Sequence, residues 1–532
     1  MRLVESRRAV QTFGVKSLLF RWLPIRLVLG FALLMRTPDL WAAETAVPSN
    51  VNVLLWFDTE DYLLPADDDA TKRLAVMLSE RGIRATFKIV GEKARTLEKR
   101  GRTDVIAALK KHDIGYHANL HSVHPTPSEY LANCGWLDGV EEFARREGGG
   151  AADVRRIFGR DTLVCYGQPG ASWAPQAYGA LVRLGIAPGG VPCYVDEDSH
   201  IKLKGEPFWY SGALTVFNMA PNFARMELHD PAAVEPAEKK FSTIADRLRS
   251  GGGGLISIYY HPCEWVHQEF WDGVNFRHGA NPPREEWKPP GQLPASETEG
   301  AFERFGKYID YIQASPGVRF VTATNLPALY PDRLRSSGAT ATDVETICAR
   351  VQRPNIAGFD YLEWEGKSFS VADQFELATA AVRDLIVTGS PHFPIRTTVQ
   401  AGPDNAAPTG ATNSQVAWPA FRDSALDVYN YLETHHRIPA RIFIGADEVA
   451  PVDFLPALAF TLNYHREHGT LPLRESIPLG KHLSMLSEQY VAKDSPAVFG
   501  NWIIHRQGFR APKILEMARL QAWTMKPALR AE

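Results

Sequence analysis

Apolar and polar positions in the first part of the chain alternate between short apolar runs and amphipathic stretches. Residues 51–57 (VNVLLWF) form a nearly continuous apolar run, which is typical of a strand buried on both faces. A helical pattern follows at about residues 70–81, then a strand pattern at 85–90 and a second helical pattern at about 104–111. This alternation of strand and helix predicts a parallel sheet or barrel.

A third strand pattern follows at residues 114–117, and others occur at residues 162–166, 213–218, 255–260 and 318–321. The count favours an α/β fold with a distorted or incomplete (β/α) barrel of about seven parallel strands. The pattern ends near Tyr330, and helical segments and loops predominate from about Gly338 onward. We therefore predict a first domain over residues 48–335 and a smaller, mainly helical domain over residues 338–532.

The N-terminal segment has the order of a secretory signal. Several arginines and lysines precede a short apolar run at residues 27–35, and the small residues Ala42 and Ala43 follow. This order predicts a signal peptide over residues 1–43 and export to the periplasm, the cell wall or the medium. The alternative is an N-terminal membrane anchor that is not cleaved.

Charge and cysteine usage narrow the class of partner. The formal net charge is -3, which argues against nucleic acid as the natural partner. The chain has 5 cysteines and no CxxC pair, so a zinc finger or a dense disulfide framework is not expected.

Carboxylates are concentrated directly after the first predicted strand. Asp58, Glu60 and Asp61 lie within four consecutive residues. Carboxylates this close repel one another unless a cation or a shared proton lies between them. One of them could bind a metal ion while another acts as a base.

Histidines follow two other predicted strands. His117 and His121 are four residues apart, with His124 shortly after them. On a helical turn, side chains at this spacing face the same way and can share one metal ion. With a carboxylate they form a two-histidine, one-carboxylate set, for which zinc is the favoured divalent ion. His261 follows the strand at residues 255–260 and is a candidate general acid.

Together these segments resemble the polysaccharide deacetylase family (carbohydrate esterase family 4) over about residues 51–329. The acidic motif is FDTED at residues 57–61, and the histidine motif is DIGYHANLH at residues 113–121. RATFKIVGEKA at residues 84–94 and IYYHP at residues 258–262 are similar to two further family segments.

The resemblance implies a role for each of these side chains. It implies Asp58 as general base, His261 as general acid, and His117 and His121 as metal ligands. Either Glu60 or Asp61 would be the third ligand. His124 could replace one of the two histidines, because residues 122–125 can be aligned with the family's histidine motif in a second register.

Two positions depart from the family pattern. Ala118 stands where the family has serine or threonine, and Gly167 and Gln168 stand where it has an arginine that orients the base. Another group must therefore hold Asp58, or the activity is altered.

A second resemblance lies in the C-terminal part. Residues 425–458 resemble the pseudomurein-binding repeat of some cell-wall proteins, with an amphipathic helix, a His/Arg-Ile-Pro turn, a short Ile/Phe strand and a second helix start. This implies that the C-terminal domain docks on wall polymer.

The predicted function is metal-dependent hydrolytic deacetylation of an N-acetylated cell-wall or extracellular polysaccharide. The expected partner is that glycan polymer, with no nucleic acid and, unless the N-terminal segment is retained, no membrane. Two alternatives stay open: a non-catalytic wall-binding protein with a degenerate deacetylase domain, and a related C–N hydrolase that acts on a small amide.

Overall fold

The computed structural model describes residues 50–197, 200–203, 205–217, 219–408 and 413–531. The predicted signal peptide or anchor over residues 1–43 lies outside the described residues, so export stays a prediction. Within the described part of the chain, no helix is both long enough and apolar enough to cross a membrane.

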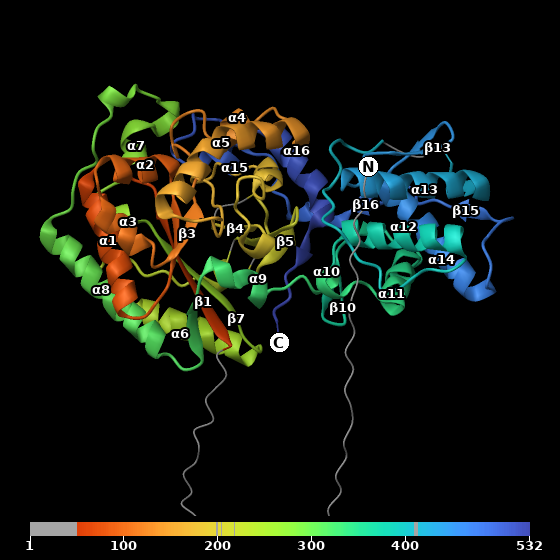
Figure 1. Ribbon diagram of the computed structural model, residues 1–532, viewed down its shortest axis with the longest axis horizontal. Coiled ribbons are helices and arrows are strands. Elements are labelled where there is room, and N and C mark those ends of the chain that lie inside the picture. Colours follow the sequence, from red (N-terminus) through yellow and green to blue (C-terminus); the bar gives the residue numbers. More distant parts are fainter. Residues whose placement is uncertain (1–49, 198–199, 204, 218, 409–412, 532) are drawn as a thin grey trace, which may run out of the picture. The chain divides into compact units, whose positions relative to one another are not determined.

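The buried apolar side chains of the described residues form two large clusters. The first core, which includes Val51, Phe57 and Phe305, is built on a parallel sheet (Figure 1). Strand β1 (Val51–Thr59) pairs in parallel with β2 (Thr86–Ile89), β7 (Gly254–Tyr260) and β8 (Val318–Val321), and β2 pairs with β3 (Asp113–Tyr116). Every residue of β1 is buried, as the apolar run predicted. The prediction of a parallel α/β sheet is confirmed.

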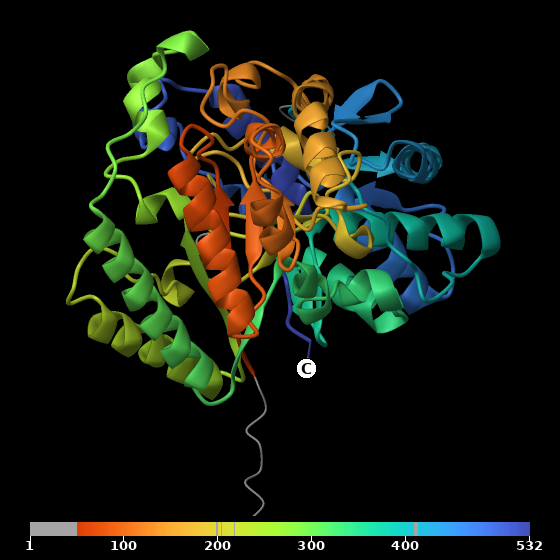
Figure 2. The same cartoon turned by 60° about the vertical axis from the view of Figure 1, so that its left-hand side comes forward.

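Helices pack against the parallel sheet (Figures 1 and 2). Helices α1 (Pro65–Glu80) and α3 (Thr103–Leu109) fall where helical patterns were predicted, and α2 (Gly91–Lys99) lies between them in the chain. Figures 1 and 2 show α1 passing over the strands, with α6 (Val234–Ser250) and α8 (Ala295–Ala314) side by side. A long helix, α5 (Trp136–Phe158), follows the predicted histidine motif.

Beyond β3 the sheet becomes irregular. The predicted strand at residues 162–166 contributes only single bridges at Tyr166, one to Tyr116 and one to Tyr194. These bridges lead to a second sheet in the order β17-β5-β6-β4, built from β4 (Cys193–Val195), β5 (Phe208–Tyr210), β6 (Ala213–Val216) and β17 (Lys526–Pro527). Because β5 and β17 run antiparallel to their neighbours, the barrel of seven parallel strands is not confirmed.

A second core is mainly helical. It is formed by α11 (Ala341–Val351), α12 (Val371–Thr388), α13 (Trp418–His435) and α14 (Pro451–His468). Short strand pairs connect them, among them β10 (Leu362–Trp364) with β11 (Lys367–Phe369) and β13 (Ile442–Ile444) with β14 (Asp447–Val449). The helical character predicted after about Gly338 agrees with these elements.

The last part of the chain returns to the first core. Phe499 and residues of α16 (Pro512–Gln521) are buried in the same apolar cluster as β1, and β17 pairs with β5. The predicted boundary at residues 335–338 stays a prediction about independent folding. The packing nevertheless places most of the buried apolar side chains of residues 491–525 in the first core, which the boundary predicted from the sequence does not reveal.

Candidate active site

Three predicted segments meet where parallel strands end. Asp58 is the second-last residue of β1, His117 follows β3 and His261 follows β7. The carboxyl ends of parallel strands meet at one edge of the sheet, where α/β folds place their sites. There the side chains line a cleft of about 380 Å³ together with Glu60 and His121. The structure therefore brings together residues that are up to two hundred positions apart in the sequence.

The two histidines converge through a loop and not through the predicted helical turn. Residues 117–121 are not helical, and Ala118 and His121 have positive φ angles of 63° and 58°. The rings of His117 and His121 nevertheless lie 5.0 Å apart between centroids. The predicted proximity is right, but its geometric reason was wrong, because two left-handed residues turn the chain back on itself.

Hydrogen bonds orient both imidazoles toward the cleft. His117 Nδ1 lies 3.0 Å from the carbonyl oxygen of Gly167, and a carbonyl can only accept, so this nitrogen carries the proton. His121 Nδ1 lies 2.6 Å from Ser122 Oγ, which donates to Asp272 at 2.9 Å. The Nε2 atoms of both rings are therefore left with lone pairs, as metal-binding histidines require.

Burial keeps both rings neutral. It holds the pKa of His117 well below its usual range and lowers the pKa of His121 to about 4. Burial, reinforced by the neighbouring carboxylates Asp272, Asp58 and Asp61, raises the pKa of Glu60 well above its usual range, although His261 opposes the shift. A buried carboxylate that faces two imidazole lone pairs is unfavourable without a positive charge between them.

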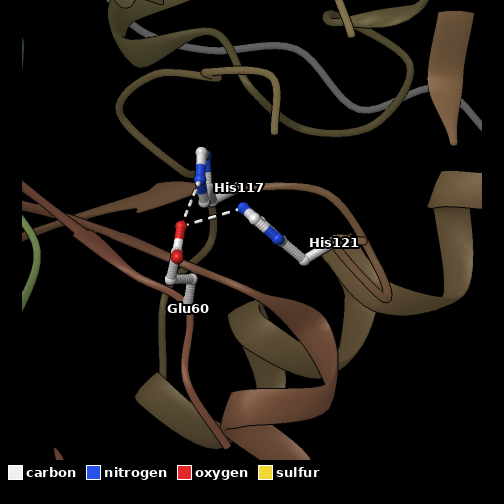
Figure 3. A group of neighbouring side chains, drawn as sticks. All are labelled: Glu60, His117 and His121. Carbon is white, nitrogen blue, oxygen red and sulfur yellow. Dashed lines mark ion pairs between the residues drawn. The ribbon is translucent and has the colours of Figure 1, made fainter. Parts of the chain in front are cut away.

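Glu60, and not Asp61, faces the histidine pair (Figure 3). Its Oε2 lies 2.9 Å from His121 Nε2 and 3.6 Å from His117 Nε2. Asp61 points to the opposite side, where its Oδ2 lies 3.0 Å from His267 Nδ1. His124 pairs with Glu129 at 2.6 Å and does not join the group.

The three side chains fit a divalent metal ion. A tetrahedral ion with bonds of about 2.0–2.2 Å separates its ligand atoms by about 3.3–3.6 Å, close to the spacing between Glu60 and the two histidines. His121 Nε2 is buried without a hydrogen-bond partner, and two imidazoles with one carboxylate are a set that suits zinc. Glu60, His117 and His121 would hold the ion.

Asp58 and His261 lie beside this group. His261 Nε2 is 3.8 Å from Asp58 Oδ2 and 4.0 Å from Glu60 Oε2. On its other side, His261 Nδ1 lies 2.7 Å from Glu264, which is itself ion-paired with Arg225. Burial opposes the imidazolium, but Glu60, Glu264 and Asp58 outweigh it and raise the pKa of His261 to about 9.

A buried lysine forms an ion pair with Asp58, the candidate base. Lys88 Nζ lies 2.8 Å from Asp58 Oδ1 and 3.1 Å from Asp196 Oδ2. Burial would raise the pKa of Asp58, but His117, Lys88 and His261 outweigh it, so the pKa is lowered. Sequence reasoning missed Lys88 and Asp196. A lysine inside the apolar run ATFKIV was the available signal for the first.

Aromatic side chains flank the cleft on both sides. Phe270 packs edge-on against His261 with centroids 4.9 Å apart, and Trp502 packs edge-on against His121 at 5.8 Å. Trp502 comes from the C-terminal segment that returns to the first core. Sequence reasoning missed it, because no local pattern links residue 502 to the histidine motif.

Comparisons with known proteins give a likeness only among solved structures. No protein-family model matches the sequence, and no curated protein matches it. A Mycobacterium smegmatis protein assigned to the polysaccharide deacetylases is 13% identical with a TM-score of 0.33, and the match covers 55% of this chain and 92% of that one. A variant of peptidoglycan deacetylase PdaC from Bacillus subtilis is 13% identical with a TM-score of 0.26, and the match covers 53% of this chain and 92% of that one.

A protein described as a pseudoenzyme is also among the solved structures that match. A pseudoenzyme of carbohydrate esterase family 4 from Bacillus anthracis is 11% identical with a TM-score of 0.24, and the match covers 52% of this chain and 65% of that one.

Proposed function

We propose that the chain is a metal-dependent hydrolase that removes acetyl groups from an N-acetylated polysaccharide of the cell wall or extracellular matrix. The observation that supports this most directly is the convergence of Glu60, His117 and His121 with Asp58 and His261 in one cleft. The set contains ligands for one divalent ion, a carboxylate held ionised, and a histidine held protonated. Metal-assisted hydrolysis of an amide can use all three.

Each side chain has a defined task in this reaction. When bound, the divalent ion would polarise the acetamide carbonyl and supply a water of lowered pKa. Asp58, whose Oδ2 faces the cleft, would accept the proton of the attacking water. His261 holds a proton on Nε2 for the leaving nitrogen, and Glu264 keeps the opposite ring nitrogen protonated.

The cleft suits a sugar polymer better than a small amide. It is open to solvent on one side, with Phe270 38% exposed and Ile503 41% exposed at its rim. Exposed aromatic and apolar side chains offer flat surfaces against which pyranose rings pack. Polar side chains of the rim, among them Glu197, Glu269 and Arg277, can accept or donate hydrogen bonds to hydroxyl groups.

Acetate release tests the proposal directly. The full chain, loaded with zinc, is assayed on chitin oligomers, peptidoglycan and acetylated exopolysaccharides, with metal content measured in parallel. We expect one zinc ion per chain and acetate from at least one glycan. His117→Ala and His121→Ala should lose both metal and activity, whereas His124→Ala should keep both.

The outcomes separate the alternatives. Zinc binding without acetate release from any glycan would support the degenerate wall-binding protein. Activity on a small amide together with inactivity on every polymer would support the third alternative. A wild-type chain that binds no divalent ion would contradict the metal-dependent mechanism.

We further propose that the second core docks the enzyme on wall polymer. The motif at residues 425–458 covers the second half of α13, the hairpin of β13 and β14, and the start of α14. At the hairpin, Phe443 is 58% exposed beside a hollow of about 320 Å³ lined by Tyr431 and Arg441. Phe443→Ala should weaken co-sedimentation with insoluble wall material and leave acetate release from a soluble oligomer unchanged.

A further inference from the structure

The Lys88 ammonium is enclosed by acceptors. The side chain is fully buried, and Nζ lies 2.8 Å from Asp58, 3.1 Å from Asp196 and 2.9 Å from the carbonyl oxygen of Val195. The ring of Trp56 lies beneath it, with its centroid 4.1 Å away. The ammonium therefore donates hydrogen bonds to Asp196 and to the Val195 carbonyl, forms an ion pair with Asp58, and has the cation–π contact on another side.

The backbone at Gly167 packs closely against the Lys88 ammonium. A Cβ atom on Gly167 would overlap Lys88 Nζ and lie 2.8 Å from Asp196 Oδ2. Residue 167 can therefore carry no side chain while Lys88 occupies this place. Gly167 and Lys88 are sterically matched, although they come from different segments of the fold.

The same ammonium lies where a second cation could otherwise bind. Asp58, His117 and Asp196 offer ligand atoms within 4.8 Å of one another. Lys88 Nζ already contacts both carboxylates of this group. A divalent ion there would have to displace the ammonium, so the free position for a metal is the one at Glu60, His117 and His121.

We propose that Lys88 is the positioning residue of Asp58. Its ammonium holds Oδ1 of Asp58 and leaves Oδ2 to face His261 and the cleft, while Asp196 and the Val195 carbonyl fix the ammonium. Lys88 acts through Asp58 and does not itself touch substrate. This rests on the proposed function only in assigning the reaction, since the geometry stands without it.

Two substitutions test this role in the full chain. Lys88→Met removes the ammonium at similar length. Lys88→Met/Asp196→Asn also removes the Asp196 carboxylate, so that Asp58 does not face a second buried carboxylate and the group that could bind a second ion loses a ligand. In both variants we expect kcat to fall by about 100-fold or more, while KM and zinc affinity stay within about threefold of wild type.

The matched control is Lys526→Met. Lys526 is likewise a buried lysine between two aspartates, 2.8 Å from Asp332 and 3.0 Å from Asp373, but it does not line the cleft. This variant should lose stability and keep its kcat. A general effect of removing a buried lysine would lower kcat in all variants alike and would overturn the proposal.

Two further results would also overturn it. One is a zinc-loaded Lys88 variant with kcat within about threefold of wild type. The other is a loss of kcat in proportion to a loss of zinc. If wild type releases no acetate from any glycan, the proposed function fails and the crystal structure of the zinc-loaded double variant decides. A displaced Asp58 carboxylate then supports the positioning role, and an unmoved one rejects it.

Discussion

Protonation of His261 depends on the side chain behind it. Glu264 accepts a hydrogen bond from His261 Nδ1 at 2.7 Å and another from the His261 backbone at 2.8 Å. His261 and Arg225 outweigh the effect of burial and lower the pKa of Glu264. A metal ion on Glu60 would cancel part of the negative charge that His261 experiences, but the contact with Glu264 would remain.

Glu264→Gln should therefore lower the upper pH limit of activity. The pKa of His261 is raised to about 9, so the proton donor is present below that pH and lost above it. Removing one carboxylate lowers this pKa, and the alkaline limit of kcat should move down by about one pH unit or more. The measurement is kcat across the neutral to alkaline range.

Glu269→Gln provides the control for this measurement. Glu269 also lines the cleft, and it is exposed. Its substitution should leave the alkaline limit in place. An unchanged limit in Glu264→Gln would show that Glu264 does not set the protonation of His261.

At the scale of elements, the acidic loop is supported by a buried ion network between α1 and α2. Lys93 of α2 lies 2.6 Å from Asp68 and forms an ion pair with Asp67, both in the first turn of α1. It also donates to the backbone oxygen of Asp61 at 2.6 Å. The network fixes the loop that carries Glu60 to two helices.

Lys93→Met should destabilise the protein strongly. It leaves Asp67 and Asp68 buried with one positive partner fewer, and removing one member of a buried pair costs about 3–5 kcal/mol. Urea unfolding of the zinc-free chain measures the loss. Lys99→Met is the matched control, since Lys99 lies on the same helix and is exposed, and it should change stability by less than about 0.5 kcal/mol. Equal stability of the two variants would refute the structural role of the network.

At the scale of the whole molecule, the C-terminal segment completes both the first core and the cleft. Phe499, Ile514 and Leu515 are fully buried in the first core. His505 is also buried, and its Nε2 lies 3.1 Å from Ser128 Oγ, seven residues after His121. The segment that carries Trp502 is therefore docked against the loop that follows the metal-site histidines.

A chain that ends at Ser337 should for this reason fail to fold like wild type. Its first core would lack the apolar side chains of residues 499–525, and loss of large buried side chains costs about 2–5 kcal/mol for each. Circular dichroism and urea unfolding compare it with the full chain. A truncated chain that unfolds cooperatively at the wild-type urea concentration would show that the first core needs no C-terminal segment.

Trp502→Ala tests whether Trp502 contributes to substrate binding without being needed for folding. Trp502 is only partly buried, and a Cβ on Gly170 would lie 2.5 Å from its indole ring, so the ring packs against the backbone at Gly170. The variant should stay folded and raise KM for a glycan oligomer about tenfold, which corresponds to ~1.4 kcal/mol. An unchanged KM would remove Trp502 from the substrate site.

The sequence by itself determined the parallel strands and the placement of Asp58, His117 and His261 at their ends. Both follow from local patterns, because a strand buried on two faces must be apolar along its whole length and its polar continuation marks the edge of the sheet. The mainly helical character of the chain after about Gly338 was also predicted from the sequence.

Only the tertiary structure decided which groups meet within the cleft. The choice of Glu60 over Asp61 depends on which way the loop after β1 turns, and that turn is set by the contacts of Lys93 and His267. The support of Asp58 by Lys88 and Asp196, and the wall formed by Trp502, join segments that are distant in the chain. Such contacts are energetically determined by burial and charge in the folded core, and no local sequence pattern encodes them.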